Sequence, residues 1–280
     1  MLPPEMEFAN VSDAGRKRPH NEDSSVTDRA VGLALVADGM GGYKAGEVAS
    51  AIAAKSVLDG VRDGSQKHRP RHPTADGQGA SAEAVLIRES IQAANKHIFD
   101  TAHSIPQCQG MGTTIVAAMF SNGRVTLAHV GDSRIYRFRE DELKQVTSDH
   151  SLVQELIDRG FFTPEEAQAN TPKNLVTRAL GIDEHVEVDV QEMETRPGDI
   201  YLLCSDGLND MITDEEIRLT LSKYSANLAQ AAHELVRLAN EGGGKDNISV
   251  VLARPRTATA GSAGILAKVM GLFTRAADRT

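Results

Sequence analysis

Short apolar runs alternate with longer helical patterns along this chain. Alternating or β-branched apolar residues predict strands at 31–38, 112–120, 124–132, 134–141, 185–191, 199–206 and 247–254. Apolar positions at helical spacing predict one helix pair at 46–63 and 81–103, and a second pair at 213–224 and 227–242. Asn122-Gly123, between two of the strand-like runs, is a strong hairpin signal, and Thr213 with Glu216 is typical of a capping box.

The order of these elements indicates the fold class. Strands come first, then a helix pair, a run of strands, a second helix pair and a last strand. Strands joined by hairpins pair in antiparallel fashion, whereas parallel strands need long crossover connections. We therefore expect an α+β fold, an α/β sandwich of two packed antiparallel sheets flanked by helix pairs.

Three segments depart from this regular pattern. Residues 62–81 are polar and rich in Gly and Pro, which predicts a mobile loop between two helices. Residues 150–181 interrupt the strands with short helical pieces, as an inserted flap would. Residues 257–280 form a tail in which a small-residue linker precedes a short amphipathic stretch. We expect one domain over 5–256, with the tail outside it.

Composition narrows the class of protein. The chain has 280 residues, of which 40% are hydrophobic and 25% charged, values typical of a soluble globular protein. Its net charge of −9 argues against nucleic-acid binding and is compatible with divalent cations. Its two cysteines make neither a disulfide framework nor a CxxC metal site. Without a signal peptide or an apolar run long enough to span a membrane, the expected location is cytoplasmic.

Acidic residues recur beside the predicted strands. Asp38 and Asp206 each end an apolar run and precede a glycine, and Asp246 comes just before the last run. The others are Glu22, Asp23 and Asp132. One aspartate before glycines can be a helix cap in a turn. Several converging carboxylates would raise one another's pKa values and destabilise the fold unless a cation neutralised them.

The ligand chemistry points to a hard cation. Oxygen ligands select Mg²⁺, Mn²⁺ or Ca²⁺, and no His/Cys cluster suggests zinc. His129 and His20 have no partner at ligand spacing, and His129 is expected to be a packed strand residue. Two cations bridged by one carboxylate can ionise water and clamp a phosphoryl group. Arg18 could bind phosphate oxygens as a fork. The chain lacks the phosphate-binding, dinucleotide-binding and nucleophile-elbow motifs of other enzyme classes.

An ordered set of motifs carries a family resemblance. "GRKRPHNEDS", "VADGMGG", "GMGTT", "HVGDSR", "NLVTRALG", "LLCSDGL" and "GKDNISVV" occur in that order over Gly15–Val251. Each motif alone is weak, but the ordered set is specific. It resembles the bacterial branch of the metal-dependent type 2C protein phosphatases, which act on phosphoserine and phosphothreonine. The resemblance implies direct attack of an activated water on phosphorus, without a phosphoenzyme.

The resemblance also implies roles for individual residues. It makes Asp38 the bridge between two Mn²⁺ or Mg²⁺ ions, with the Gly39 carbonyl at the second ion. It places Asp206 and Asp246 at the first ion. Its remaining assignments are Glu22 and Asp23 at the second ion, directly or through water, Asp132 at a third, weaker ion, and Arg18 on the phosphate.

The sequence departs from the family pattern in two places, and three functions remain possible. Met40 stands where many eukaryotic relatives have a histidine proposed as general acid, so the leaving group must be protonated otherwise. The flap matches the bacterial pattern only loosely.

The first function is a phosphatase that acts on phosphoproteins and opposes a bacterial Ser/Thr kinase, as a cytoplasmic monomer. The alternatives are a phosphatase of a sigma-factor switch and a pseudo-phosphatase that binds phosphoproteins without turnover.

Overall fold

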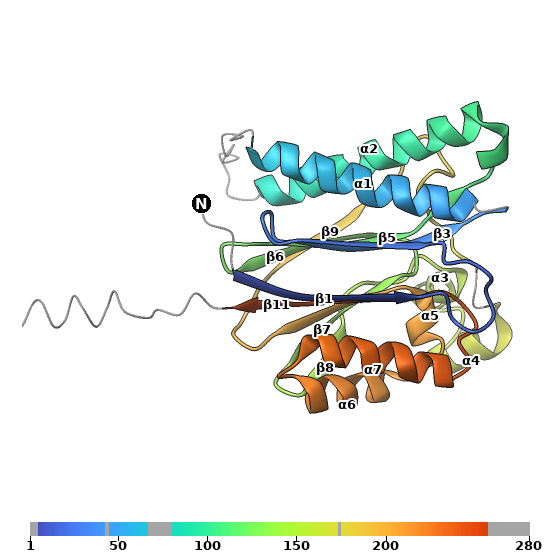
Figure 1. The fold of residues 1–280 in the computed structure, drawn as a ribbon. Helices are drawn as coiled ribbons and strands as arrows, with labels where there is room; N and C mark the ends of the chain where they lie inside the picture. The colour runs from blue at the N-terminus through green and yellow to red at the C-terminus, as the bar shows by residue number, and fades with distance from the viewer. Residues whose placement is uncertain (1–4, 43–44, 67–79, 173–174, 257–280) are drawn as a thin grey trace, which may run out of the picture.

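Two antiparallel sheets lie face to face between two layers of helices (Figure 1). This computed structural model describes residues 5–42, 45–66, 80–172 and 175–256. The five-stranded sheet has the order β1 (Glu5–Asp13), β11 (Ile248–Arg256), β10 (Ile200–Cys204), β7 (Arg134–Arg139) and β8 (Glu142–Gln145). The other sheet has the order β2 (Asp23–Asp28), β3 (Leu33–Met40), β5 (Ile115–Ser121), β6 (Arg124–Val130) and β9 (Asp189–Glu194), with β4 (Gly112–Thr113) paired to β3. The predicted α+β sandwich is confirmed.

Each sheet carries one helix pair on its outer face (Figure 1). Helices α1 (Ala45–Gln66) and α2 (Ala82–Ser104) cover the sheet of β3, and α6 (Asp214–Tyr224) and α7 (Leu228–Glu241) cover the sheet of β10. The remaining helices are short: η1 (Pro106–Cys108), α3 (Leu152–Asp158), α4 (Pro164–Asn170) and α5 (Asp206–Asn209). Among the described residues, no helix has both the length and the apolar character needed to cross a membrane.

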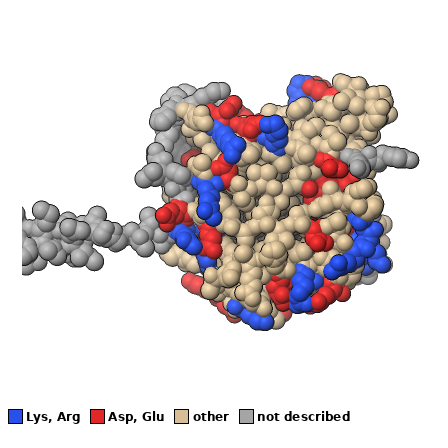
Figure 2. Space-filling model, viewed as in Figure 1, with Lys and Arg blue, Asp and Glu red and all other residues tan. Residues whose placement is uncertain are grey.

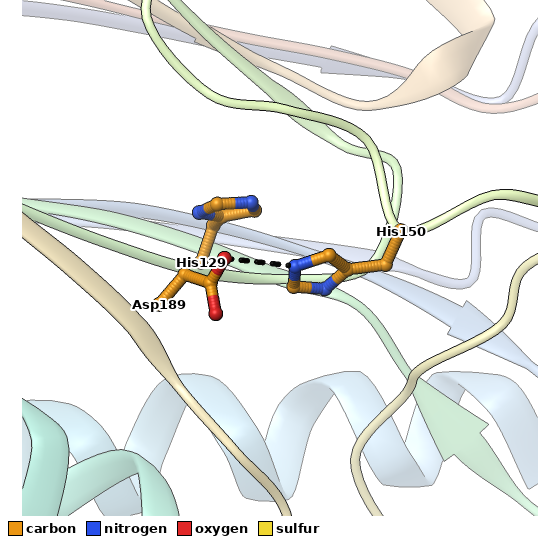
Figure 3. Close-up of side chains that lie close together, drawn as sticks. All are labelled: His129, His150 and Asp189. Carbon is orange, nitrogen blue, oxygen red and sulfur yellow. Dashed lines mark hydrogen bonds and ion pairs between the residues drawn. The ribbon is translucent and has the colours of Figure 1, made fainter. Parts of the chain in front are cut away.

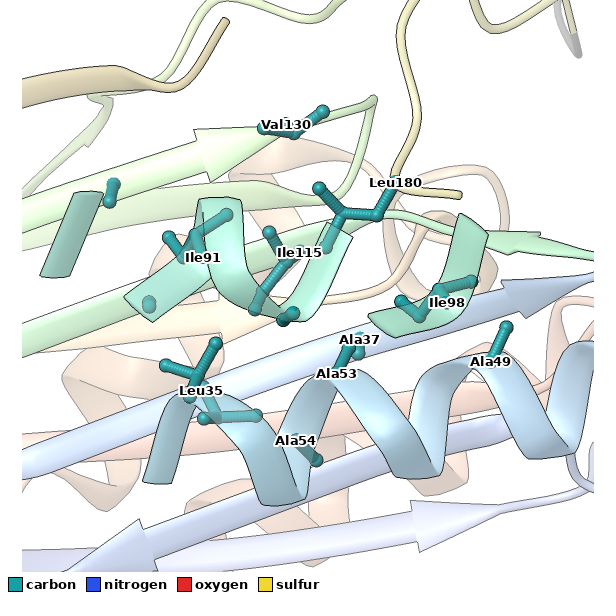
Figure 4. Packing of buried hydrophobic residues seen from close by; sticks show 14 of the residues in the cluster. Leu35, Ala37, Ala49, Ala53, Ala54, Ile91, Ile98, Ile115, Val130 and Leu180 are labelled. Carbon is teal, nitrogen blue, oxygen red and sulfur yellow. The ribbon is translucent and has the colours of Figure 1, made fainter. Parts of the chain in front are cut away.

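Three apolar layers hold the sandwich together. One lies between α1/α2 and its sheet, one between α6/α7 and the other sheet, and one between the two sheets. In the first layer, Ala49 and Ala53 of α1 face Leu35 and Ala37 of β3 (Figure 4). Alanines spaced four residues apart present one smooth helix face, so α1 lies close against the strand. This packing fixes the end of β3, where Asp38 lies.

Local signals explain several boundaries. Asn122 and Gly123 both adopt positive φ, 49° and 74°, as the predicted two-residue hairpin between β5 and β6 requires. Thr213 and Glu216 exchange the two hydrogen bonds of the predicted capping box.

Cys204 is buried in β10. On the face shown in Figure 2, acidic and basic side chains are interspersed around an uncharged centre.

Some sequence-based boundaries were wrong. The strands β1, β2 and β8 were not predicted, the strand expected at 185–191 lies at Asp189–Glu194, and α1 continues through 62–66, where a loop was expected. The rest of that loop, 67–79, lies outside the described residues, as does the tail 257–280. The strand β1 mixes polar residues with apolar ones, of which Met6 and Ala9 are buried, and β2 is mostly polar. Both strands pair along their whole length, with β11 and β3 respectively, so backbone hydrogen bonds help to position strands that are not continuous apolar runs.

Candidate metal centre

The predicted acidic residues come from the ends of strands in both sheets. Asp38 lies near the end of β3 and is the direct cross-strand partner of Asp23, the first residue of β2. Asp206 begins α5, directly after β10, and Asp246 lies just before β11. Asp132 follows β6. These ends meet at one edge of the sandwich because the two sheets stack with their strands roughly aligned (Figure 1).

The carboxylates at this edge influence one another's pKa values. Burial raises the pKa of Asp38 well above its usual value, and the charges of Asp23, Asp206, Asp132 and Asp246 raise it further. The same two causes raise the pKa of Asp206 to about 8, with Asp132 its strongest charged neighbour. Burial is also the largest cause that raises the pKa of Asp23, and that of Asp132, to about 6. Removal from water and like-charge crowding therefore both disfavour ionised carboxylates here.

Two carboxylate oxygens in this cluster have no hydrogen-bond partner. They are Oδ1 of Asp23 and Oδ1 of Asp206, and both are shielded from solvent. An unpaired buried polar atom is costly unless a ligand satisfies it. Oxygen donors, crowded negative charge and orphaned buried oxygens together fit a hard divalent cation such as Mn²⁺ or Mg²⁺.

The carboxylate oxygens of the cluster are not gathered into a compact set. Among the described residues, no three of its carboxylates bring oxygen atoms within 4.8 Å of one another. Asp246 instead accepts a hydrogen bond from Nη2 of Arg18 at 2.7 Å. This pair raises the pKa of the Arg18 guanidinium, whose side chain remains 54% exposed. Arg18 is thus anchored beside the carboxylates and keeps N–H groups free for an anion.

Glu22 reaches the same edge through its backbone. Its N–H donates to Oδ1 of Asn247 at 2.8 Å, and its carbonyl accepts from Gly39 N–H at 3.2 Å and from Ser50 Oγ at 2.6 Å. Burial is the main cause that raises the pKa of the Glu22 carboxyl. The segment that carries Glu22 and Asp23 is therefore fixed against both β3 and α1.

Close backbone contacts explain two of the glycines. A Cβ atom on Gly39 would lie 2.1 Å from the Gly46 carbonyl oxygen and 2.5 Å from the Glu22 carbonyl oxygen. A Cβ atom on Gly207 would lie 2.0 Å from the Asn247 carbonyl oxygen. Each glycine follows a predicted ligand, so the absent side chain lets that ligand's strand end pack directly on a neighbouring segment.

Sequence reasoning missed several residues of this site. Ser205 is fully buried and donates to Oδ2 of Asp23 at 2.9 Å, and Thr114 receives no role from the sequence although its Oγ1 accepts the Asp38 N–H at 3.1 Å. The charge of Asp210 helps to raise the pKa values of both Asp132 and Asp206. Both Ser205 and Thr114 could have been found from their places in the motifs "LLCSDGL" and "GMGTT".

A small cavity opens next to the centre. Its volume is about 160 Å³, and it is lined by Asp206, Gly207, Asp210, Met211, Lys245 and Asp246. Lys245 is exposed at this cavity. The cavity therefore joins the carboxylate cluster to solvent, and its lining combines three acidic side chains with one basic one.

Known proteins share the sequence of this chain over most of its length. A family model described as Protein phosphatase 2C matches residues 16–246. The chain is 42% identical over 250 residues to serine/threonine protein phosphatase PstP of Mycobacterium tuberculosis, a match that covers 89% of this chain and 45% of that protein. It is 39% identical over 244 residues to serine/threonine phosphatase stp of Listeria monocytogenes, with 86% of this chain and 92% of that protein covered.

Solved structures give the same result. The crystal structure of the catalytic domain of PstP in complex with two manganese ions has a TM-score of 0.74 and 38% sequence identity to this chain. The alignment covers 89% of this chain and 97% of that one. This chain spans a little under half the length of the Mycobacterium tuberculosis relative, and nearly the whole of the Listeria protein.

Proposed function

The chain belongs to the protein phosphatase 2C family, and we propose that it is a metal-dependent phosphatase that hydrolyses phosphoserine and phosphothreonine in proteins. The observation that carries the proposal is the crowding of Asp23, Asp38 and Asp206 at one sandwich edge, with orphaned buried oxygens and raised pKa values. Such a cluster is expensive as bare protein and is suited to cations. The exposed guanidinium of Arg18 beside it supplies an anion site.

The family resemblance of the sequence motifs indicates which residues would hold the cations. Asp38 is central because its pKa responds to four of the other carboxylates. The set comprises Asp38, Gly39, Asp206 and Asp246 for two Mn²⁺ or Mg²⁺ ions, Glu22 and Asp23 beside them, and Asp132 for a weaker third ion. When bound, such ions supply Lewis-acid chemistry, ionising water and neutralising charge on a phosphoryl group.

The chain's own residues orient the substrate. Arg18 binds phosphate oxygens through the N–H groups that its pair with Asp246 leaves free. Ser205 fixes Asp23 and Thr114 fixes the backbone of Asp38, so the carboxylates keep their places when the substrate arrives.

No side-chain acid is available at Met40, the residue that ends β3. A thioether cannot donate a proton, so the leaving serine or threonine oxygen must take its proton from water or another donor. This makes the rate of the chemical step sensitive to the basicity of the leaving group.

The biological setting is part of the same proposal. The substrates are phosphorylated proteins, and the opposing enzyme is a bacterial Ser/Thr kinase. Because such kinases use cytoplasmic ATP, we place the phosphatase in the cytoplasm, and we expect it to act there as a monomer. Phosphoproteomics of a deletion strain identifies the substrates and separates this role from a sigma-factor switch, in which phosphoserine on small antagonist proteins would accumulate.

The test of the activity is Asp38→Asn. The variant keeps the side-chain volume and removes a charge from the proposed cation site, so kcat on an aryl phosphate and on a phosphothreonine peptide should fall by about 10²-fold or more. Asp183→Asn, an exposed carboxylate outside the site, is the matched control and should retain wild-type kcat. Activity of Asp38→Asn within about tenfold of wild type, a barrier change of ~1.4 kcal/mol or less, would refute the proposed role.

A further inference from the structure

One polar cluster outside the carboxylate centre is satisfied by its own neighbours. It consists of His129 in β6, His150, and Asp189 in β9 (Figure 3). His129 is a packed strand residue, as expected, but it does have a neighbour, because its ring stacks on that of His150 at 4.6 Å between centroids and 23° between planes. Nη1 of Arg178 donates to Oδ1 of Asp189 at 2.9 Å and lies 3.2 Å from Nε2 of His150. An arginine therefore already supplies the positive charge that this cluster could attract.

Basic side chains gather instead on the loop between β1 and β2, at the sandwich edge where the acidic strand ends meet (Figure 1). Arg16, Lys17 and Arg18 follow one another in this loop, and all three are exposed. Lys245 is exposed as well, in the loop before β11. Arg18 pairs with Asp246. The side chains of the other three, which we call the basic rim, form no ion pair or hydrogen bond with any residue that the structure describes.

Hydrogen bonds fix the backbone of the loop that carries most of the rim. The buried amide of Asn247 donates to the carbonyl of Ala14 at 3.0 Å and to that of His20 at 2.9 Å. The N–H of Gly15 donates to Oδ1 of Asp13 at 2.8 Å. Both ends of the loop are therefore tied down, and only the cationic side chains remain to be ordered when a ligand binds.

The loop before β11 packs directly against the first loop. The Gly244 carbonyl accepts the N–H of Arg16 at 2.7 Å and that of Lys17 at 3.2 Å. A Cβ atom on Gly244 would lie 2.8 Å from Cγ of Arg16, so the Arg16 side chain passes over this glycine. Lys245 lines the cavity of about 160 Å³ that opens beside Asp246. The basic rim therefore lies next to the carboxylate cluster.

We propose that the basic rim selects phosphoprotein segments in which acidic residues flank the phosphorylated serine or threonine. The inference rests on the proposed function in taking the carboxylate cluster as the place where the phosphoryl group binds. Bound divalent cations would neutralise the carboxylates, and the rim then adds positive charge beside the phosphoryl group. Because no carboxylate among the described residues pairs with the rim, its cations can pair with carboxylates of the substrate.

An acidic peptide fits the rim better than a nucleic acid does. The rim offers only Arg16, Lys17 and Lys245, on a chain whose net charge is −9. A nucleic acid needs an extended basic footprint, whereas a few carboxylates on a peptide need only a few cations. Exposed charge pairs change affinity by about 1.5- to 5-fold each, so we expect an effect of about tenfold from the rim as a whole.

The experiment uses two phosphothreonine peptides of equal length, one with glutamates and one with glutamines on both sides of the phosphothreonine. Hydrolysis in Mn²⁺ gives kcat/KM for each peptide. Fluorescence anisotropy gives Kd for the same two peptides with a non-hydrolysable phosphonate in place of the phosphate. The wild-type full chain should favour the glutamate peptide by about tenfold in both quantities, and about 0.5 M NaCl should reduce this preference to less than about threefold.

A triple variant of the rim tests its three charges together: Arg16→Gln, Lys17→Gln and Lys245→Gln. Because it removes the charges and keeps polar side chains, the preference for the glutamate peptide should fall to within about twofold. The matched control removes three exposed cations elsewhere, each at the far end of a strand whose other end leads to the acidic cluster: Arg29→Gln, Arg124→Gln and Arg196→Gln. The control should keep the wild-type preference within about twofold.

Equal Kd values of the wild type for the two phosphonate peptides, or binding of neither, would refute the role of the rim. The same conclusion would follow if the control lost the preference as fully as the rim variant does, because net charge alone would then set it. If the rim triple variant does not fold, the three single variants replace it, and each should lower the preference by about 1.5-fold or more.

The two readouts separate this inference from the proposed function. A wild type that prefers the glutamate phosphonate peptide but hydrolyses neither phosphopeptide would refute the proposed function and leave the rim standing. A wild type that hydrolyses both phosphopeptides with equal kcat/KM would refute the rim and leave the proposed function standing.

Discussion

Replacing Asp206 by asparagine is expected to stabilise the metal-free protein while destroying its activity. Asp206 has an unpartnered buried oxygen, and burial followed by the charges of Asp132, Asp210 and Asp246 raises its pKa to about 8. Below that pH the metal-free native state holds a proton that the unfolded chain, with its usual pKa of 3.8, releases. Asparagine is neutral in both states and removes this difference.

Proton linkage gives the sign and size of the expected change in the free energy of unfolding. When folding raises the pKa of a carboxyl group, the free energy of unfolding falls as the pH rises from the unfolded pKa toward the folded pKa. The native state is therefore more stable at acid pH than at neutral pH. Between the unfolded pKa and pH 7 lie about three pH units, and at about 1.4 kcal/mol for each unit the wild type loses roughly 4 kcal/mol. Asp206→Asn should recover that amount at pH 7 and well under about 1 kcal/mol at pH 4.

Urea unfolding in EDTA, followed by circular dichroism from pH 4 to pH 8, measures the effect. Asp183→Asn makes the same change of net charge at an exposed site and should alter the free energy of unfolding by no more than about 0.5 kcal/mol at either pH. Mn²⁺ should stabilise the wild type more than Asp206→Asn, because the variant has lost a cation ligand. A stability difference that stays the same at pH 4 and pH 7, or a variant less stable than wild type at pH 7, would refute the reasoning.

Three further predictions concern catalysis. Dialysis against EDTA should abolish activity and Mn²⁺ or Mg²⁺ should restore it, whereas recovery with Zn²⁺ alone would contradict an all-oxygen ligand set. Deletion after Arg256, where β11 ends beside Glu5, should preserve kcat on a small aryl phosphate; a large fall would place the tail in the catalytic unit. Met40→His should flatten the dependence of kcat on leaving-group pKa by speeding the poorest leaving groups, at most by about 10²–10⁴-fold, while Met40→Leu leaves the slope unchanged.

The strands that could be predicted from the sequence are those whose burial requires a run of apolar residues. The strands β3, β5, β6, β10 and β11 are apolar runs because both of their faces are covered, by helices on one side and by the opposite sheet on the other. The strand β2 has the sequence DSSVTD and lies at a sheet edge, where pairing with β3 supplies its order. Only knowledge of that neighbour could have revealed it.

Some parts of the candidate site could be predicted from the sequence, and other contacts could not. Asp38 and Asp206 could be singled out because several carboxylates recur beside apolar runs, although a single aspartate before glycines can be a helix cap. The contacts of His150 could not, since they join Gly131, Thr177 and Asp189, which only the tertiary fold brings together. Periodicity carries no information about such pairs.

The carboxylates of the cluster repel one another, and neutral groups between them hold the strand ends together. Ser205 donates to Asp23 and accepts the N–H of Ser249, and the Asn247 side chain accepts the N–H of Glu22. These bonds link the ends of β2, β10 and β11 without adding charge, and they are buried, so losing one leaves unpaired partners. In the metal-free state the neutral groups therefore raise the free energy of unfolding while the carboxylates lower it, and cation binding is what allows the fold to keep both.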